Sequence, residues 1–395
     1  MSDRIKRVSD IVSGLENELR DLALKIHSTP ELGHEEFKAC QWQIELLEKY
    51  GFKVERNFCG MATAYKAVYK GKKSGPKIAM LAEYDALPEL GHGCGHNLIA
   101  MVGVGSGIAM SEFADEYGGE IYVIGTPAEE TAGGKVEMAR QGAFNDMDVA
   151  MMAHPAYMNC DSLNTMATTA LRFEFFGVPS HAASTPYEGI NALDGVINFF
   201  NMVNALRQQT KSDARIHGII KKGGVAPNII PDYAEALFYV RTNKTDYLDE
   251  LREKVINCAK GAALGTGTRL EVSSAEEDFK DTNSNMTLSN LCCDQVEKLG
   301  VEVLRLNGET VPGSSDLGDV SYSCPAVQTV FKIGDAEGNP FGGAHTERFA
   351  ECAGSEFGIQ SGLTYIKGFT MTAIELMTEP KHLKAIKEEF SKIAK

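Results

Sequence analysis

A thiol and an imidazole lie two residues apart in the glycine-rich segment of residues 91–97, GHGCGHN. The thiolate of Cys94 and the neutral imidazole of His96 are both good ligands for zinc-like ions. The glycines around them let the backbone turn tightly enough to aim both groups at one point. Such a pair also arises by structural accident, so a metal site requires further ligands at comparable places in the chain.

Further candidate ligands stand in three other loops of the expected fold. In an open α/β sheet, ligands gather at the carboxyl ends of the strands, so partners for Cys94 and His96 are expected there. Taken singly each candidate is ordinary, because a Glu-Glu pair is often a solvated loop and a histidine before proline is often a packing residue. Their joint placement at one edge of one sheet points to a metal site. The candidates are Glu129, Glu130, His154 and His345.

The adjacent carboxylates Glu129 and Glu130 fit metal-assisted amide hydrolysis. We expect the two side chains to point to different sides of the backbone, so that one binds a metal and the other faces a metal-bound water. A divalent ion lowers the pKa of such a water towards about 7, and a nearby carboxylate can take its proton and pass it to a leaving amine.

Strands and helices alternate in the part of the chain that carries these residues. Apparent strands cover residues 77–83, 120–126 and 148–153, and helices are expected over 98–114 and 134–142. This order predicts an α/β sheet whose strands are largely buried.

The pattern changes from about residue 168 to strand, helix, strand, strand, helix, strand. This is the order of a split βαβ, ferredoxin-like α+β sandwich. We therefore expect an inserted domain over residues 168–278, which interrupts a first domain made of residues 1–167 and 279–395.

Composition and charge exclude several classes of protein. A length of 395 residues is too great for one simple core, and a net charge of -15 argues against a nucleic-acid partner. The chain has no apolar run of about 18 residues, so we expect no membrane span. The nine cysteines are odd in number and scattered, which favours reduced thiols in a cytoplasmic protein.

Six short motifs, taken together, resemble the bimetal aminoacylase and carboxypeptidase family. The resemblance covers essentially the whole chain. It is strongest to the amidohydrolase branch of the p-aminobenzoyl-glutamate hydrolase B subunit and the β-alanyl-lysine type dipeptidases, because of CGHN at residues 94–97 and SDLGDVS at 315–321. The motifs are PELG at residues 30–33, YDALP at 84–88, GHGCGHN at 91–97, PAEE at 127–130, HP at 154–155 and GVPSHAA at 177–183.

This resemblance implies a mixed-sheet metallopeptidase catalytic domain, with the inserted domain as a lid and dimerisation domain. It implies two divalent ions, zinc or manganese, with Glu129 as the general base. Cys94 corresponds to a terminal ligand in place of the histidine that many relatives carry in a His-x-Asp pair, where this chain has Glu83-Tyr84-Asp85. Asp85 is then expected to orient a ligand by hydrogen bonding, while it stays open whether Glu83 reaches a metal. The implied ligands are Cys94, His96, Glu130, His154 and His345.

The inserted domain carries candidates of its own. A loop histidine such as His181 is usually a surface residue, but in similar enzymes the corresponding histidine reaches into the partner subunit's active site and stabilises the oxyanion. Asn228 and Arg241 resemble the pair that holds the substrate's carboxylate, and Gly313 and Ser314 could add backbone contacts.

The sequence thus predicts a metal-dependent amidohydrolase or dipeptidase. Its substrate would be a dipeptide or an N-acyl amino acid, with aminobenzoyl among the possible acyl groups, and an amino acid with a free carboxylate would be released. We expect a homodimer formed through the lid domain. A partner-dependent or non-catalytic subunit of a heteromeric hydrolase is the alternative, although the chain carries all five ligands and the base. A structural zinc site would leave Glu129 surplus beside Glu130.

Overall fold

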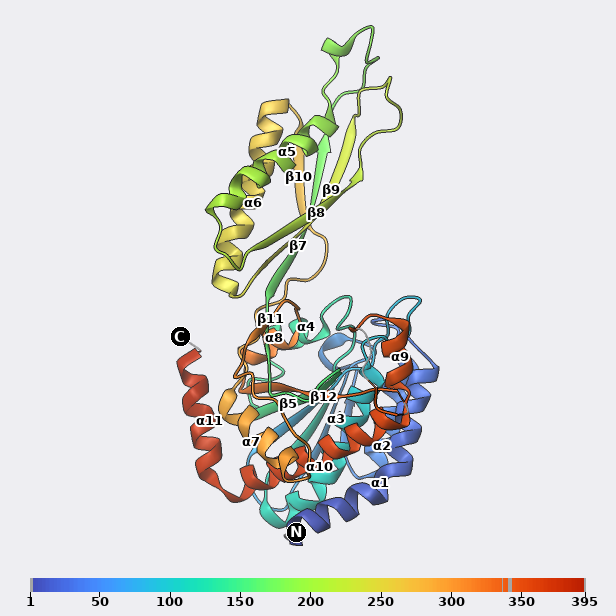
Figure 1. Ribbon diagram of the computed structural model, residues 1–395, viewed down its shortest axis with the longest axis vertical. Helices are drawn as coiled ribbons and strands as arrows, with labels where there is room; N and C mark the ends of the chain where they lie inside the picture. Colours follow the sequence, from blue (N-terminus) through green and yellow to red (C-terminus); the bar gives the residue numbers. More distant parts are fainter. Residues whose placement is uncertain (1–2, 336, 340–342, 394–395) are drawn as a thin grey trace. The chain divides into compact units, whose positions relative to one another are not determined.

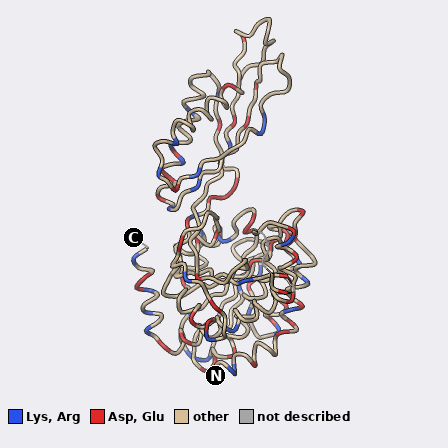
Figure 2. The backbone as a smooth tube through the Cα atoms, viewed as in Figure 1, with Lys and Arg blue, Asp and Glu red and all other residues tan. Residues whose placement is uncertain are grey.

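The computed structural model describes residues 3–335, 337–339 and 343–393, and the chain folds into two compact units. The first unit combines the chain up to Asn164 with Thr282–Val311 and with the chain from Asp316 onwards. The second unit comprises Thr165–Asp281 and Pro312–Ser315. Acidic and basic residues are interspersed along both units (Figure 2).

A mixed six-stranded sheet forms the centre of the first unit, in the order β1-β2-β4-β3-β5-β12. The last four of these strands run parallel to one another, whereas β1 and β2 form an antiparallel edge. The three strands predicted from sequence are β3, β4 and β5, and the structure confirms the α/β fold. The strands are β1 (Lys53–Arg56), β2 (Tyr65–Lys70), β3 (Lys77–Ala82), β4 (Glu120–Gly125), β5 (Val149–Ala156) and β12 (Ala326–Lys332).

Helices cover both faces of this sheet (Figure 1). The face that carries Ile78, Met80 and Val123 packs in one core with α1, α2, α3 and α10, and the opposite face packs with α4 and α8. The helices of the first unit are α1 (Asp3–Ser28), α2 (Phe37–Lys49), α3 (His96–Tyr117), α4 (Gly134–Arg140), α7 (Met286–Glu297), α8 (Leu317–Ser321), α9 (Glu347–Ala353), α10 (Glu356–Thr378) and α11 (Pro380–Ile393).

Helix α3 crosses the middle of this core. Its length and composition would suit a membrane span, but 94% of its most apolar window is buried inside the unit. Small residues allow the close packing, since a Cβ at Gly103 would lie 2.8 Å from the carbonyl oxygen of Leu81. We therefore regard α3 as the core helix of the unit, with its first residue, His96, at the carboxyl edge of the sheet.

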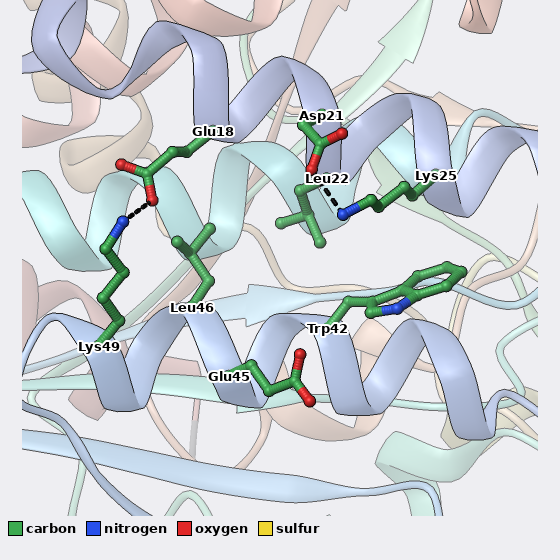
Figure 3. A pocket seen from close by; sticks show the side chains of 8 residues that line it. All are labelled: Glu18, Asp21, Leu22, Lys25, Trp42, Glu45, Leu46 and Lys49. Atoms are coloured by element: carbon green, nitrogen blue, oxygen red, sulfur yellow. Dashed lines mark hydrogen bonds and ion pairs between the residues drawn. The ribbon is translucent and has the colours of Figure 1, made fainter.

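A surface groove runs between α1 and α2 (Figure 3). Leu22 and Trp42 line it, and ion pairs join Glu18 to Lys49 and Asp21 to Lys25 along it. Its lining residues include none of the residues that the sequence predicts for the metal site.

The second unit is a four-stranded antiparallel sheet, in the order β10-β7-β9-β8, with two helices. The chain order β7, α5, β8, β9, α6, β10 confirms the predicted split βαβ sandwich. Phe173, Phe199 and Phe238 form the centre of its core. The elements are β7 (Ala167–Phe176), α5 (Ala192–Leu206), β8 (Arg215–Lys222), β9 (Tyr233–Thr242), α6 (Thr245–Thr266) and β10 (Arg269–Ser274).

Short elements complete the chain. They are the 3-10 helices η1 (Phe58–Gly60), η2 (Pro186–Glu188) and η3 (Arg207–Gln209), and the two-residue strands β6 (Asn164–Thr165) and β11 (Thr310–Val311).

Candidate metal centre

The loop between β3 and α3 presents the thiol of Cys94, and the imidazole of His96 follows at the first residue of α3. Both Cys94 and His96 are buried. Gly95 between them has φ 77°, and a Cβ there would lie 2.5 Å from Cγ of Pro155. Only glycine tolerates both the left-handed backbone and this close approach. The spacing of the pair therefore depends on Gly95.

All five ligands implied by the sequence come together at the carboxyl edge of the sheet, in two groups. In one group the ligand atoms of Cys94, His96 and His154 lie within 4.8 Å of one another. In the other, the ligand atoms of Cys94, Glu130 and His345 also lie within 4.8 Å of one another. Cys94 belongs to both groups. Its role as a terminal ligand, which the family resemblance implies, stays a prediction.

Nδ1 is the hydrogen-bonded ring nitrogen of buried His96 and of half-buried His154, and Nε2 of His154 lies 3.5 Å from Sγ of Cys94. His96 Nδ1 lies 2.9 Å from Oδ1 of Asp85, and His154 Nδ1 lies 2.8 Å from the carbonyl oxygen of Pro155. Asp85 Oδ2 also accepts the backbone N–H of Glu130 at 3.0 Å, so this carboxylate orients two candidate ligands at once. Among the described residues, Nε2 of His96 has no hydrogen-bond partner although it is buried. A buried nitrogen left free in this way fits a divalent cation.

The carboxylates Glu129 and Glu130 lie in a turn after β4. An oxygen atom of each lies within 4.8 Å of a ring nitrogen of His96. The other neighbours of the two carboxylates differ. Glu130 Oε1 lies 3.2 Å from His345 Nε2, whereas an oxygen of Glu129 lies within 4.8 Å of Glu83 and Asp316.

Local charge separates the basicities of these two carboxylates. Burial, and then the neighbouring charges of Glu83 and Glu130, raise the pKa of Glu129 well above its ordinary value. Burial also disfavours the ionised form of Glu130, but the hydrogen bond from His345 and the charge of His96 lower its pKa overall. Glu129 is therefore suited to exchange a proton, and Glu130 to remain an anionic ligand.

The environment of Cys94 does not suit a nucleophile. Burial raises the pKa of its thiol well above the usual range in the metal-free chain. A catalytic thiolate needs the opposite shift, whereas a divalent cation deprotonates a coordinating thiol directly. This agrees with a ligand role for Cys94.

Two buried charges beside the centre were not identified from sequence. Glu36 Oε1 accepts the backbone N–H of Ala128 at 2.8 Å, which fixes the residue before Glu129 in its left-handed conformation at φ 60°. Lys135, on the first turn of α4, is fully buried and forms ion pairs with Glu83 and Asp316. A lysine is rarely buried, so its residue type gave no signal of this position.

The predicted residues of the second unit form two pairs. The loops of His181 and Asn228 are joined by a hydrogen bond from Ala182 N–H to the Asn228 carbonyl, at 3.0 Å. Arg241, on β9, has its Nη1 3.4 Å from Oγ of Ser314. The predicted residue Gly313 precedes Ser314, and its carbonyl oxygen accepts the N–H of Met166 at 2.7 Å.

Comparisons with known proteins agree with this arrangement. A family model described as a peptidase dimerisation domain matches residues 167–266, in the second unit. The solved structure of a dinuclear metal-binding peptidase of the M20 family from Bacillus subtilis has the same fold, with a TM-score of 0.70 and 21% identity. It covers 93% of this chain and 99% of that chain.

Sequence similarity extends over the whole chain. The Xaa-Arg dipeptidase of Mus musculus is 37% identical over 402 residues, which cover 98% of this chain and 91% of that protein. The chain belongs to the M20 metallopeptidase family. The B subunit of the p-aminobenzoyl-glutamate hydrolase of Escherichia coli is another M20 relative, 32% identical over 292 residues, or 69% of this chain and 60% of that protein.

Membership of the M20 family confirms the resemblance drawn from the motifs. The chain is a metal-dependent amidohydrolase of the dipeptidase type. Its cofactors are divalent metal ions, and the two overlapping ligand groups match the dinuclear description of the Bacillus subtilis peptidase. The alternative of a non-catalytic subunit is not favoured.

Proposed function

We propose that this M20 enzyme hydrolyses dipeptides and releases the C-terminal amino acid with its carboxylate free. The observation that carries the proposal is the pair of ligand groups that share Cys94, with the carboxylate of Glu129 beside them. A mouse relative named Xaa-Arg dipeptidase makes dipeptides that end in arginine the first substrates to test.

In this proposal the ligands divide between two ions. Cys94, His96 and His154 would hold one, and Cys94, Glu130 and His345 the other. When bound, zinc or manganese would polarise the scissile carbonyl and lower the pKa of water towards about 7. Because Nδ1 of His96 is hydrogen-bonded to Asp85, the other ring nitrogen, Nε2, is directed towards this centre.

Glu129 moves the proton. Its carboxylate takes a proton from the attacking water and gives it to the nitrogen of the leaving amino acid, so that the amine departs neutral and the base is restored. The raised pKa of Glu129, which results from burial and from the nearby carboxylates, supports both steps.

The second unit would supply substrate recognition. Arg241 presents a guanidinium that can bind a carboxylate through two hydrogen bonds, and its buried Nε has no hydrogen-bond partner within the described chain. We assign the substrate carboxylate to Arg241 and Asn228, with contacts from Gly313 and Ser314. His181 would donate to the oxyanion in the partner subunit's active site.

That role of His181 requires a homodimer, which we propose forms through the second unit. Strand β8 is an edge strand of its sheet, and its Ile219 and Ile220 are 59% and 45% exposed. Helix α5 of the same unit also exposes Ile197 and Met202. An apolar edge of this kind is normally covered by another chain. The match to a peptidase dimerisation domain points to a second copy as that chain.

N-acyl amino acids are the second substrate class. The similarity to one subunit of a p-aminobenzoyl-glutamate hydrolase favours testing aminobenzoyl-glutamate, although that match covers less of the chain than the dipeptidase match. We further propose a reducing, cytoplasmic location, because all nine cysteines lie among the described residues and are free thiols.

The proposed function is tested with the chain purified alone and stripped of metal by EDTA. Dipeptides ending in Arg, Lys or Leu, N-acetyl-arginine and aminobenzoyl-glutamate are assayed with added Mn²⁺, Zn²⁺ or Co²⁺. We expect cleavage of the Arg dipeptides, restored by metal after EDTA. Cleavage of aminobenzoyl-glutamate alone would change the proposed substrate class from dipeptides to N-acyl amino acids. No cleavage with any metal would contradict the proposal.

A further inference from the structure

A lysine lies where buried carboxylates meet beside the metal centre. Lys135 is fully buried, and its Nζ lies 2.6 Å from Oε1 of Glu83 and 2.6 Å from Oδ1 of Asp316. The backbone N–H of Lys135 donates to the other oxygen of Asp316 at 2.9 Å. Both carboxylates are themselves buried, so this ammonium is held from two sides away from water.

The same two carboxylates form a cage with Glu129, the proposed base. One oxygen each of Glu83, Asp316 and Glu129 lie within 4.8 Å of one another, a geometry that would suit a metal ion. Three carboxylates at this separation repel one another unless a cation lies among them. The ammonium of Lys135 supplies that cation from within the chain, through its contacts with Glu83 and Asp316.

The cage lies directly beside the groups that bind the ions. Glu83 Oε2 lies 3.5 Å from Nε2 of His96, and Glu129 reaches within 4.8 Å of the same histidine. The charges of Glu83 and Asp316 therefore act on Glu129, and that of Glu83 acts on His96 as well. One buried ammonium contacts both of these carboxylates.

We propose that Lys135 is a positioning residue whose ammonium takes the place of a metal ion between Glu83, Asp316 and Glu129. It prevents a third metal ion from binding between these three carboxylates, so that the centre binds two metal ions. It also holds Glu83 and Asp316 in place, and through them it fixes the direction of the Glu129 carboxylate. The inference rests on the proposed function for the role of Glu129, but the cation count does not depend on any substrate.

The first test counts cations and uses no substrate. Metal-free wild-type protein and Lys135→Ala are titrated with Mn²⁺, and bound ion is measured by equilibrium dialysis and elemental analysis. We expect saturation at two equivalents for wild type and three for Lys135→Ala. A third equivalent in wild type, or two in a folded Lys135→Ala protein, would overturn the proposal.

The second test separates positioning from charge balance. Lys135→Met removes the ammonium but keeps a side chain of similar length. We expect kcat to fall by about 100-fold with KM changed less than about twofold, because a misplaced catalytic group lowers the rate by about this factor. The double variant Lys135→Met/Asp316→Asn removes one charge of each sign, which protects folding if the single variant is unstable. A positioning role leaves kcat low in the folded double variant, whereas recovery of kcat would show that Lys135 only balances charge.

A matched control is available on the surface of the same unit. Lys70 also forms an ion pair, with Glu120 at 3.4 Å, but its side chain is 70% exposed. Lys70→Met should retain two equivalents of Mn²⁺ and the wild-type kcat. An equal loss of kcat in this variant would show that the effect of Lys135→Met is not specific to the cage.

Discussion

The two units of this protein place their functional groups in opposite ways. In the first unit the charged groups of the site contact one another before any substrate arrives, and all but the exposed His345 are buried or half-buried, as with Asp85 and His96 at 2.9 Å. In the second unit His181 and Asn228 are exposed and Arg241 is half-buried. The difference teaches that the catalytic charges are organised by the fold, whereas the binding groups are left open to be completed by the substrate or by a second chain.

The largest effect should come from the base. Glu129→Gln keeps the shape of the side chain but removes proton transfer, and we expect kcat to fall by about 10³-fold with metal content unchanged. The measurement is dipeptide hydrolysis combined with elemental analysis of the same sample. Glu89→Gln, at an exposed position of the loop after β3, is the matched control and should be fully active. Retained hydrolysis in Glu129→Gln would remove the proposed mechanism.

The shared thiol should affect both ions. Residues that only orient metal ligands already contribute about 10- to 100-fold in affinity, so Cys94→Ser should weaken binding by more than about 100-fold. We expect both equivalents of Zn²⁺ to weaken in Cys94→Ser and one in His345→Ala, because His345 belongs to one group only. Competition titration with a chelating dye measures this. If Cys94→Ser weakened the binding of only one equivalent of Zn²⁺, Cys94 would be a ligand of one ion and not of both.

The accessible side chains of the second unit should affect substrate binding and leave the metal content unchanged. Arg241→Met removes a charge-assisted hydrogen bond, and we expect kcat/KM to fall about 10- to 100-fold, mainly through KM, with unchanged metal content. Arg172→Met is the control, since Arg172 is an exposed arginine of the same sheet. A fall in metal content with Arg241→Met would contradict the contrast between the two units.

The last expected effect concerns stability and not catalysis. Burial, and next the hydrogen bond with its own backbone, shift the pKa of Glu36, and burial dominates and raises it to about 7. Because the folded pKa lies above that of the unfolded chain, near 4.5, the stabilisation is complete below about pH 4.5 and is lost as the pH rises through about 7. The contribution is on the order of 3 kcal/mol.

Thermal unfolding at pH 5.5 and pH 8 tests this dependence. Glu36→Gln cannot titrate, so its Tm should fall less between the two values than that of the wild-type protein. Glu45→Gln, at an exposed position of helix α2, which begins directly after Glu36, should show the wild-type difference. Equal differences in all three proteins would show that Glu36 does not titrate in this range.

The sequence allowed prediction of the parts that depend on local patterns. The long strands, the split βαβ order and the five candidate ligands follow from periodicity, from glycine loops and from family motifs. Strands β1, β2 and β12 were not identified. Strands β1 and β2 form a lysine-bearing pair at one edge of the sheet, and such strands resemble loops, whereas β12 at the other edge is seven residues long and mostly buried. The roles of Lys135 and Glu36 could not be predicted either, since they depend on burial between segments distant in sequence.

The insertion of the second unit affects the order in which the site can be assembled during synthesis. Strand β12 pairs with β5 from Ala326 opposite Ala150, and the N–H of His345 donates to the carbonyl oxygen of Gly93 at 2.9 Å. Both contacts join segments that leave the ribosome before and after the whole inserted unit. Because domains tend to fold as they emerge, the inserted unit can fold while the first is still incomplete. A nascent chain therefore cannot assemble the full ligand set until translation has passed His345, which delays hydrolytic activity until the inserted unit and both flanking parts of the site have been synthesised.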